Sequence, residues 1–244
     1  MGKVLAAYNL KKQYKERVVV RDISFKALSG EITGILGPNG AGKTTFFYML
    51  MGLVMADSGR VLLDEADITS LPLYQRARIG LGYLPQEVSI FRGLTVADNI
   101  MAVLEMRHED QQIRKQILDE ILDQFSISHL RSASAVALSG GERRRLEIAR
   151  AMAMQPTFLL LDEPFAGVDP IAIAEIKDLI LKLKAQGTGV IITDHNVRDA
   201  LPMTDRSYVI YDGEVLAEGA PNDIIANQQV KERYLGDAFV TGGL

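Results

Sequence analysis

A glycine-rich stretch, GPNGAGKTT over Gly37–Thr45, constrains this sequence more than any other feature. It fits the pattern G-x-x-x-x-G-K-[ST], in which glycines let the backbone curl with its N–H groups pointing inward. Those donors, together with the positive end of a following helix, form a cage for a diphosphate or triphosphate. The flanks agree, because Glu31–Leu36 is typical of a short buried strand and Thr45–Leu50 of a helix. The stretch therefore predicts a phosphate-binding loop between a strand and a helix.

The polar residues at the end of this loop have separate expected tasks. Lys43 supplies a mobile positive charge for the β- and γ-phosphates, and Thr44 supplies a hydroxyl for Mg²⁺. The expected nucleotide-binding residues are the whole loop, namely Gly37, Pro38, Asn39, Gly40, Ala41, Gly42, Lys43, Thr44 and Thr45.

The bulk composition excludes several classes of protein. With 244 residues, 48% hydrophobic and 24% charged, the chain is long enough for one large core or a core with an attached subdomain. A net charge of −4 argues against nucleic acid as a partner. The absence of cysteine excludes disulfides and thiolate metal sites and suits a reducing cytoplasm. No window approaches the roughly 18 apolar residues of a membrane span, so any membrane role requires a partner.

Strand-like and helix-like segments alternate along the chain. Short runs within residues 3–28 predict antiparallel strands, and residues 207–219 predict a hairpin around Asp212-Gly213. Residues 87–155 are mainly helical in pattern, with an apolar stripe at Ile113, Ile117, Ile121 and Phe125. We therefore expect an α/β fold with a parallel doubly wound sheet, an antiparallel β subdomain and an inserted α-helical subdomain.

Two adjacent carboxylates follow a predicted buried strand that begins at Thr157. Asp162 is placed to hold the magnesium of a bound triphosphate, because the carboxyl end of a parallel strand brings an acidic residue there. Glu163 is then free to polarise a water that attacks the γ-phosphate. The bland alternative is that strand ends often turn polar as they reach the surface.

The segment LSGGE, Leu138–Glu142, predicts a second phosphate-binding helix end. Ser139 and Glu142 also satisfy the S-x-x-E capping box, which simply starts a helix. The two glycines between them, however, each cost a helix about 1 kcal/mol relative to alanine. Bare N–H groups at the positive end of a helix make an anion site. Two such ends exceed what one nucleotide needs, so we expect a head-to-tail homodimer in which each ATP lies between the loop of one subunit and the Ser139 helix of the other.

An aromatic residue and a histidine complete the candidate site. Tyr14 is expected on a loop between the first two strand runs, where its ring offers a flat face to a purine; plain packing is the alternative. His195 follows the predicted strand Gly189–Thr193, at the sheet edge where Asp162 also lies. His108 and His129 sit in polar surroundings that favour a solvated surface role.

Taken together, these segments resemble the ATP-binding subunits of ABC transporters over nearly the whole chain. Order and spacing both match, and the corresponding motifs are Walker A (Gly37–Thr45), the Q-loop residue Gln86, the signature (Leu138–Glu142), Walker B (Phe158–Glu163), the D-loop (Ala166–Asp169) and the switch His195. A GTPase is disfavoured because that signature has no place there and no Asn-Lys-x-Asp guanine reader appears.

The resemblance implies ATP hydrolysis and a role for each residue. Tyr14 would stack on adenine, Glu163 would be the catalytic base and His195 would contact the γ-phosphate. Gln86 would sense the metal and the attacking water, and Asp162 would hold the metal together with Thr44.

The signature and D-loop would act across the dimer. Ser139, Gly140 and Gly141 would reach the ATP of the partner subunit, and Asp169 would link the two sites. The implied organisation is a single domain over residues 1–244. Its parts are a RecA-like core with β subdomain (1–86 and 156–236), a helical signature subdomain (87–155) and a C-terminal tail (237–244).

A finer resemblance points to the lipopolysaccharide-export branch of the family. It rests on the four stretches Tyr83–Arg92, Leu161–Pro170, Ile192–Arg198 and Val230–Gly236. It implies docking to two integral-membrane subunits from the cytoplasmic face of the inner membrane. The open alternatives are the ATPase of a branched-chain amino acid or other importer and a soluble assembly-type ABC ATPase.

Two residues are implied to contact those membrane subunits. Phe91 and Arg92 would line the groove that receives a helix of the membrane subunits, since an apolar residue beside an arginine suits a docking anchor. Gly93 stands where this branch has a second basic residue. The alternative for Phe91 is burial within its own helical subdomain.

Overall fold

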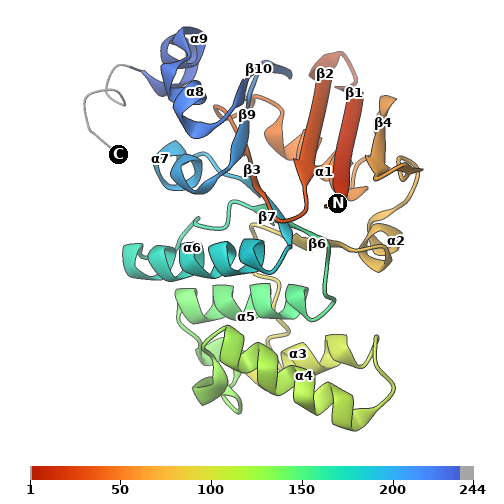
Figure 1. Cartoon of the computed structure of the whole chain (residues 1–244), viewed down its shortest axis with the longest axis vertical. Coiled ribbons are helices and arrows are strands. Elements are labelled where there is room, and N and C mark those ends of the chain that lie inside the picture. The colour runs from red at the N-terminus through yellow and green to blue at the C-terminus, as the bar shows by residue number, and fades with distance from the viewer. Residues whose placement is uncertain (1, 237–244) are drawn as a thin grey trace.

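One mixed sheet runs through the molecule, and the helices lie around it (Figure 1). The computed structural model describes residues 2–236. In this range the sheet is ten-stranded, in the order β5-β4-β1-β2-β10-β9-β3-β8-β7-β6. The strands are β1 (Val4–Tyr14), β2 (Arg17–Leu28), β3 (Ile32–Leu36), β4 (Ser58–Leu63), β5 (Ala66–Asp67), β6 (Leu81–Leu84), β7 (Phe158–Asp162), β8 (Gly189–Thr193), β9 (Arg206–Tyr211) and β10 (Glu214–Gly219).

Helices and short helical turns connect these strands. The longer helices are α1 (Lys43–Met51), α2 (Leu73–Arg78), α3 (Val96–Leu104), α4 (Gln111–Gln124), α5 (Gly140–Met152) and α6 (Pro170–Ala185). The shorter ones are η1 (Ser128–Leu130), η2 (Ala135–Ala137), α7 (Val197–Ala200), η3 (Leu201–Met203), α8 (Pro221–Ala226), α9 (Gln228–Val230) and η4 (Lys231–Leu235). Over residues 2–236, none of them has the length and apolar character needed to cross a bilayer.

The sheet divides into a parallel part and an antiparallel part, which confirms the expected fold class. Strands β6, β7, β8, β3 and β9 pair in parallel, whereas β1, β2, β4 and β5 pair antiparallel. The predicted hairpin is β9–β10. In the parallel part, Asp162 pairs with Thr193 and Ile35 pairs with Thr193 from the other side. The carboxyl ends of β3, β7 and β8 therefore lie at one edge.

Both faces of the parallel part are buried, which explains its continuous apolar strands. In β7, Phe158 and Leu160 join a hydrophobic cluster formed with α1 and the antiparallel strands. Leu159 and Leu161 point the other way, into a cluster formed with the helices α3 to α6. Because successive side chains of a strand point to opposite faces, β7 packs against a different layer on each face of the sheet.

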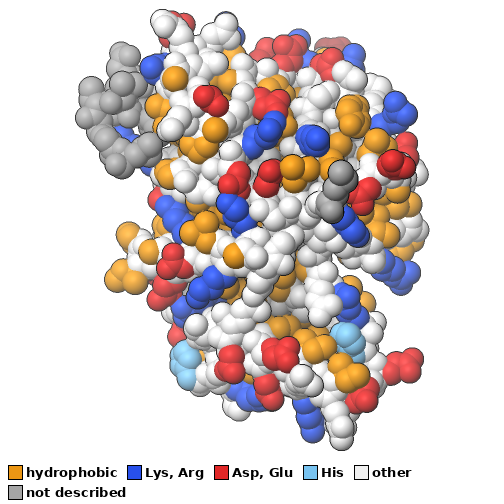
Figure 2. Space-filling view, viewed as in Figure 1, with side chains coloured by type: hydrophobic (Ala, Val, Ile, Leu, Met, Phe, Trp, Pro, Cys, Tyr) orange, Lys and Arg blue, Asp and Glu red, His pale blue; other side chains and the backbone are white. Residues whose placement is uncertain are grey.

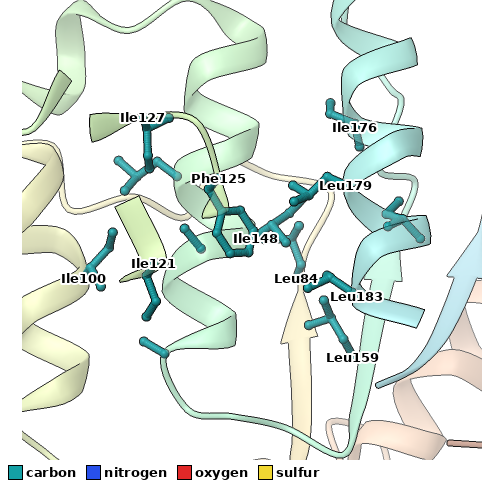
Figure 3. Close-up of a cluster of buried hydrophobic side chains, with 14 of the residues drawn as sticks. Leu84, Ile100, Ile121, Phe125, Ile127, Ile148, Leu159, Ile176, Leu179 and Leu183 are labelled. Atoms are coloured by element: carbon teal, nitrogen blue, oxygen red, sulfur yellow. The ribbon is translucent and has the colours of Figure 1, made fainter. Parts of the chain in front are cut away.

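The helices α3, α4 and α5 form the part of the molecule farthest from the antiparallel strands (Figure 1). Figure 3 shows Ile148 of α5, Leu159 of β7 and Leu183 of α6 in one apolar cluster. Hydrophobic contact is therefore continuous from these helices to the sheet. The division at residues 87 and 155 stays a prediction, and the proposed tail, residues 237–244, lies outside the described residues.

Two local expectations need correction. Ile113 is 47% exposed and departs from the predicted stripe of α4, whereas Ile117, Ile121 and Phe125 pack in the buried cluster as predicted. Leu118 and Leu122 join them on the buried face. Tyr14 is not on a loop: it is the last residue of β1 and pairs with Arg17 across a two-residue turn. Neither turn residue is glycine or asparagine, so the sequence lacks the usual hairpin signal.

A buried arginine closes the end of the helix that follows the phosphate loop. Arg76 is 1% exposed and donates to the carbonyl oxygens of Met49 and Leu50 at 2.8 and 2.6 Å. It also donates to the carbonyls of Thr69 and Leu71, both at 2.8 Å. Burial lowers the pKa of Arg76 to about 10. The guanidinium satisfies carbonyls at the negative end of α1, where a cation is favourable.

Replacing this arginine is expected to destabilise the fold. Arg76→Met leaves four carbonyls without their donor, and we expect a loss of about 3 kcal/mol in the free energy of unfolding. For a domain of this size the thermal midpoint should fall by about 6–12 °C, measurable by circular dichroism. Arg78→Met, at an exposed position of the same helix, is the control and should change little. Equal midpoints for the two variants would contradict the capping role.

Candidate active site

The phosphate loop begins directly after β3 and is held between two other strands. Gly37 adopts φ 145°, and a Cβ there would lie 2.1 Å from the carbonyl oxygen of Ile210 in β9. Gly42 adopts φ 102°, and a Cβ there would lie 2.5 Å from the carbonyl oxygen of Val19 in β2. Both conformation and space therefore require glycine. The loop shape depends on strands from both parts of the sheet.

Lys43 lies folded into the loop. Its Nζ donates to the carbonyl oxygens of Gly37 and Pro38 at 2.7 and 2.9 Å, and the residue is 7% exposed. Burial lowers the pKa of Lys43 from its ordinary value, and the nearby carboxylates of Glu163, Asp194 and Asp162 oppose that shift. An ammonium held only by carbonyl oxygens is ready to exchange them for phosphate oxygens.

A cavity of about 340 Å³ opens beside the loop. The predicted site residues that line it are Tyr14, Asn39, Gly40, Gly42, Lys43, Thr44, Thr45 and Glu163. Arg17 and Val19 line it as well and were not predicted. The only hint of Arg17 in the sequence is that it follows Tyr14 by three residues. The hairpin turn between them makes the two residues neighbours, because Tyr14 pairs with Arg17.

Glu163 is the meeting point of three segments that are distant in the sequence. Gln86, just beyond β6, donates from Nε2 to Glu163 Oε2 at 2.9 Å. His195, just beyond β8, has Nδ1 at 3.3 Å from the same oxygen. The structure thus brings the three predicted catalytic residues together, and one of them, Glu163, lines the same cavity as Lys43.

The backbone at Glu163 is in the left-handed region, with φ 44°. Its N–H donates to the carbonyl oxygen of Thr193 at 2.9 Å, and this hydrogen bond links Glu163 to the last residue of β8. This conformation costs a non-glycine residue of the order of 1 kcal/mol, and such strain concentrates at functional sites. With this conformation the backbone at Glu163 leaves the extended course of β7, which ends at Asp162.

Asp162 remains inside the sheet edge. It is 4% exposed and accepts a 2.6 Å hydrogen bond from Thr193 Oγ1. Burial raises the pKa of Asp162, the Thr193 hydrogen bond opposes that rise, and the charge of Glu163 adds to it. A carboxylate destabilised in this way gains from a bound cation.

The predicted metal-binding residues fit a magnesium ion by the chemistry of their donor atoms. The Asp162 carboxylate, the Thr44 hydroxyl and the Gln86 amide oxygen are all oxygen donors, which Mg²⁺ prefers. Within residues 2–236, no group of three or more His, Cys, Asp or Glu side chains is placed to hold a metal alone. Phosphate oxygens and water would therefore complete the coordination.

The signature forms the N-terminus of α5, and its capping box is present. The Glu142 N–H donates to Ser139 Oγ at 3.3 Å, and the Ser139 N–H donates to Glu142 Oε2 at 2.8 Å. Gly141 is tightly packed, since a Cβ there would lie 2.6 Å from that of Ala172 in α6. Gly140 is exposed, and a Cβ there would make only an ordinary contact, 3.9 Å from the carbonyl oxygen of Gly167. The glycines therefore serve close helix packing as well as bare N–H groups.

The signature does not line the cavity beside the phosphate loop of its own chain. The residues that line the cavity come from β1, β2, the phosphate loop, α1 and Glu163, without Ser139, Gly140 or Gly141 among them. Asp169 likewise lies outside that lining and caps α6, accepting from the N–H groups of Ile171 and Ala172 at 3.1 and 3.0 Å.

A separate, mostly apolar cavity of about 260 Å³ lies between the sheet and the helical part. Residues of α2, β6, α3 and α5 line it, and Figure 2 shows the molecule hollowed on this side. Phe91 is 49% exposed, which excludes its full burial in the helical part. The guanidinium of Arg150, which lines the cavity, lies 4.8 Å from the Phe91 ring centroid. Arg92 is exposed beside it.

Two buried charges of α5 were missed by sequence reasoning. Arg144 donates to the carbonyl oxygens of Pro85 and Pro164 at 3.0 and 3.2 Å and pairs with Glu147 at 3.0 Å. Pro85 directly precedes Gln86, and Pro164 directly follows Glu163. A run of three arginines, as at residues 143–145, is typical of a solvated helix face. The signal that was available is helical spacing, because Arg144 shares a face with Gly141 and Ile148.

Comparison with known proteins agrees with this geometry. Residues 20–166 match the ABC transporter family. A probable ABC transporter ATP-binding protein of Azorhizobium caulinodans is 57% identical over 235 residues, 96% of this chain and 84% of that protein. The lipopolysaccharide export system ATP-binding protein LptB of Haemophilus influenzae is 54% identical over 237 residues, 97% of this chain and 98% of that protein.

Solved structures support the same assignment. The ADP conformation of an ATP-binding cassette of an ABC transporter superposes with a TM-score of 0.84 at 29% identity, covering 96% of this chain and 99% of that one. A dimeric ATP-binding cassette in a post-hydrolysis state with ADP and Pi gives a TM-score of 0.78 at 25% identity, covering 89% and 98%. Because the family match spans more than half of the sequence and the relatives align along nearly all of it, this chain belongs to the ABC transporter family, as an ATP-binding subunit.

Proposed function

We propose that this chain is the ATP-hydrolysing subunit of an ABC transporter that extracts lipopolysaccharide from the inner membrane for export. The observation that carries the catalytic part is the convergence of Gln86 and His195 on Glu163 beside the phosphate loop. The transported substrate is inferred from the 54% identity to LptB over 97% of the chain.

ATP is proposed to occupy the 340 Å³ cavity with its phosphates in the loop. The adenine would lie toward Tyr14, whose half-exposed ring also lines this cavity. Lys43 would exchange its two carbonyl partners for β- and γ-phosphate oxygens. Mg²⁺ held by Asp162 and Thr44 supplies charge neutralisation of the phosphates when bound.

Hydrolysis needs a base that accepts a proton from the attacking water. Glu163 suits this role because it lines the cavity and one of its carboxylate oxygens is contacted by both Gln86 Nε2 and His195 Nδ1. Gln86 and His195 orient that oxygen, and the second oxygen stays available to the water. As the water oxygen bonds to the γ-phosphorus, the bond to the bridging oxygen breaks and ADP and phosphate form.

The active unit is proposed to be a head-to-tail homodimer. Within one chain the signature glycines do not line the cavity, which supports their contact with the nucleotide of a second copy instead. A second copy would bring the Ser139 end of its α5 over the γ-phosphate, with Asp169 beside the joint between the sites. ATP then contacts both copies and its hydrolysis weakens their association.

The cavity beside Phe91 is proposed as the docking groove for the membrane subunits. It combines apolar walls with Arg150 and the exposed pair Phe91 and Arg92, which suits a helix with an apolar anchor and an acidic residue. Two integral-membrane subunits would each occupy one groove of the dimer. This arrangement places the chain peripherally on the cytoplasmic face of the inner membrane.

Replacing the candidate base is expected to stop hydrolysis. Glu163→Gln keeps the size and the hydrogen bond to Gln86 but removes the proton acceptor, so hydrolysis should fall by at least about 100-fold. ATP binding should persist, and gel filtration with ATP should show a trapped dimer. The exposed Glu109→Gln is the matched control and should hydrolyse ATP normally. Brisk single-turnover hydrolysis by Glu163→Gln would remove Glu163 from this role.

Replacing the apolar residue beside the groove is expected to weaken docking of the membrane subunits. Phe91→Ala should leave ATP hydrolysis by the isolated subunit unchanged, because Phe91 is half exposed and does not line the cavity proposed to hold ATP. Co-purification with the membrane subunits from detergent should fall several-fold, since the anchor is lost. Ile113→Ala, 47% exposed on α4, is the control. Recovery of membrane subunits at the wild-type yield would argue against docking at Phe91.

A further inference from the structure

The C-terminal turn η4 packs beside the strand that leads into the phosphate loop. Its Tyr234 joins a hydrophobic cluster that contains Leu36 and Val197. Leu36 is the last residue of β3, directly before the loop, and Val197 begins α7, two residues after His195. In Figure 1 the preceding helices α8 and α9 lie beside β9 and β10. The proposed function gives this turn no role, although it touches the segments on both sides of the candidate site.

Tyr234 carries a polar group into this apolar cluster. Among residues 2–236, its hydroxyl oxygen is buried without a hydrogen-bond partner. Burial raises the pKa of Tyr234 to about 12, the backbone of Gly37 opposes that rise, and the charge of Asp194 adds to it. The hydroxyl is therefore close to the first residue of the phosphate loop and within the field of a carboxylate. A buried phenol usually has a hydrogen-bond partner, so one without a partner calls for an explanation.

Asp194 holds the second unpartnered atom. It is 1% exposed and lies between the end of β8 and His195. Its Oδ1 accepts the Asn196 N–H at 2.7 Å and so fixes the turn that contains His195. Its Oδ2 is buried and has no hydrogen-bond partner in the described part of the chain. A phenol O–H donates and a carboxylate oxygen accepts, so the two unpartnered atoms are complementary.

The phosphate loop contributes the third group. Lys43 Nζ donates to the Gly37 carbonyl oxygen at 2.7 Å, and phosphate oxygens would replace that carbonyl as the partner of the ammonium. Gly37 is therefore a part of the loop whose restraints change when phosphates enter. Its N–H is a donor, and a phenol oxygen can accept one hydrogen bond while it donates another.

We propose that Tyr234 is a positioning residue of the ATPase site. With nucleotide in the loop, its hydroxyl accepts from the Gly37 N–H and donates to Asp194 Oδ2, so that a filled loop fixes the turn that carries His195. The inference rests on the proposed ATP site and adds a residue that does not line the cavity itself.

The first test removes only the hydroxyl. Tyr234→Phe keeps the ring in its apolar cluster, so the thermal midpoint should change little. We expect kcat for ATP to fall about three- to tenfold, as for the loss of one hydrogen bond. KM for ATP should change less than about twofold, because the loop and Lys43 are intact. Tyr8→Phe, at a 47% exposed position of β1, is the control and should match the unmodified chain.

The second test observes His195 directly. The sequence has three histidines, so the ring signals of His195, His108 and His129 can be assigned in ¹H–¹³C NMR spectra. With ADP and Mg²⁺ bound, Tyr234→Phe should shift the His195 signal and leave the other two unchanged. An unchanged His195 signal together with unchanged kcat would refute the positioning role.

A double-mutant cycle tests whether the hydroxyl acts through the carboxylate. Asp194→Asn keeps an oxygen for the Asn196 N–H but replaces the Oδ2 acceptor with an NH₂ donor. Tyr234→Phe should therefore have little further effect on kcat in the Asp194→Asn background. An equal loss in both backgrounds would refute the link to Asp194. Absence of ATP hydrolysis by the unmodified chain would instead count against the proposed function itself.

Discussion

The parallel pairing of β3, β7 and β8 is the constraint on which the candidate site depends. Because Ile35 and Asp162 both pair with Thr193, the three strands end at one edge. The phosphate loop, Glu163 and the segment with His195 each leave the sheet there. Burial of both sheet faces fixes this register, since a slip of one residue would exchange the side chains of two separate hydrophobic clusters. The catalytic geometry is thus a consequence of the packing of a double-sided apolar sheet.

Helix capping and the proposed contacts across the dimer involve the same residues in this chain, so their structural and functional interpretations do not exclude each other. Ser139 caps α5 and Asp169 caps α6 through hydrogen bonds that any stable helix would use. Capping, however, does not require the exposed glycine at position 140, which leaves backbone N–H groups uncovered. A helix end that is stabilised by its own serine and still open to an anion can wait for a ligand without losing its shape.

How much the sequence predicted depends on how local each feature is. The loop from Gly37 and the carboxylates after β7 are encoded in consecutive residues, so their elements and positions were predictable. The end of β1 at Tyr14 depends on pairing with β2, and the burial of Arg144 depends on carbonyls contributed by other segments. Helical spacing alone did not reveal that Ile113 faces solvent, because α4 is covered on only part of its apolar side. Tertiary contact decided each of these cases.

Arg144 also provides a physical connection between the groove and the candidate base. Its guanidinium is buried on α5, the helix that starts at the signature and whose Arg150 stacks on Phe91. It donates to the carbonyls that flank Gln86 and Glu163, and Gln86 in turn donates to Glu163. A displacement of α5 caused by a partner in the groove would have to break these bonds or move both segments. Since a buried guanidinium left without partners costs several kcal/mol, movement of both segments together is the favoured response.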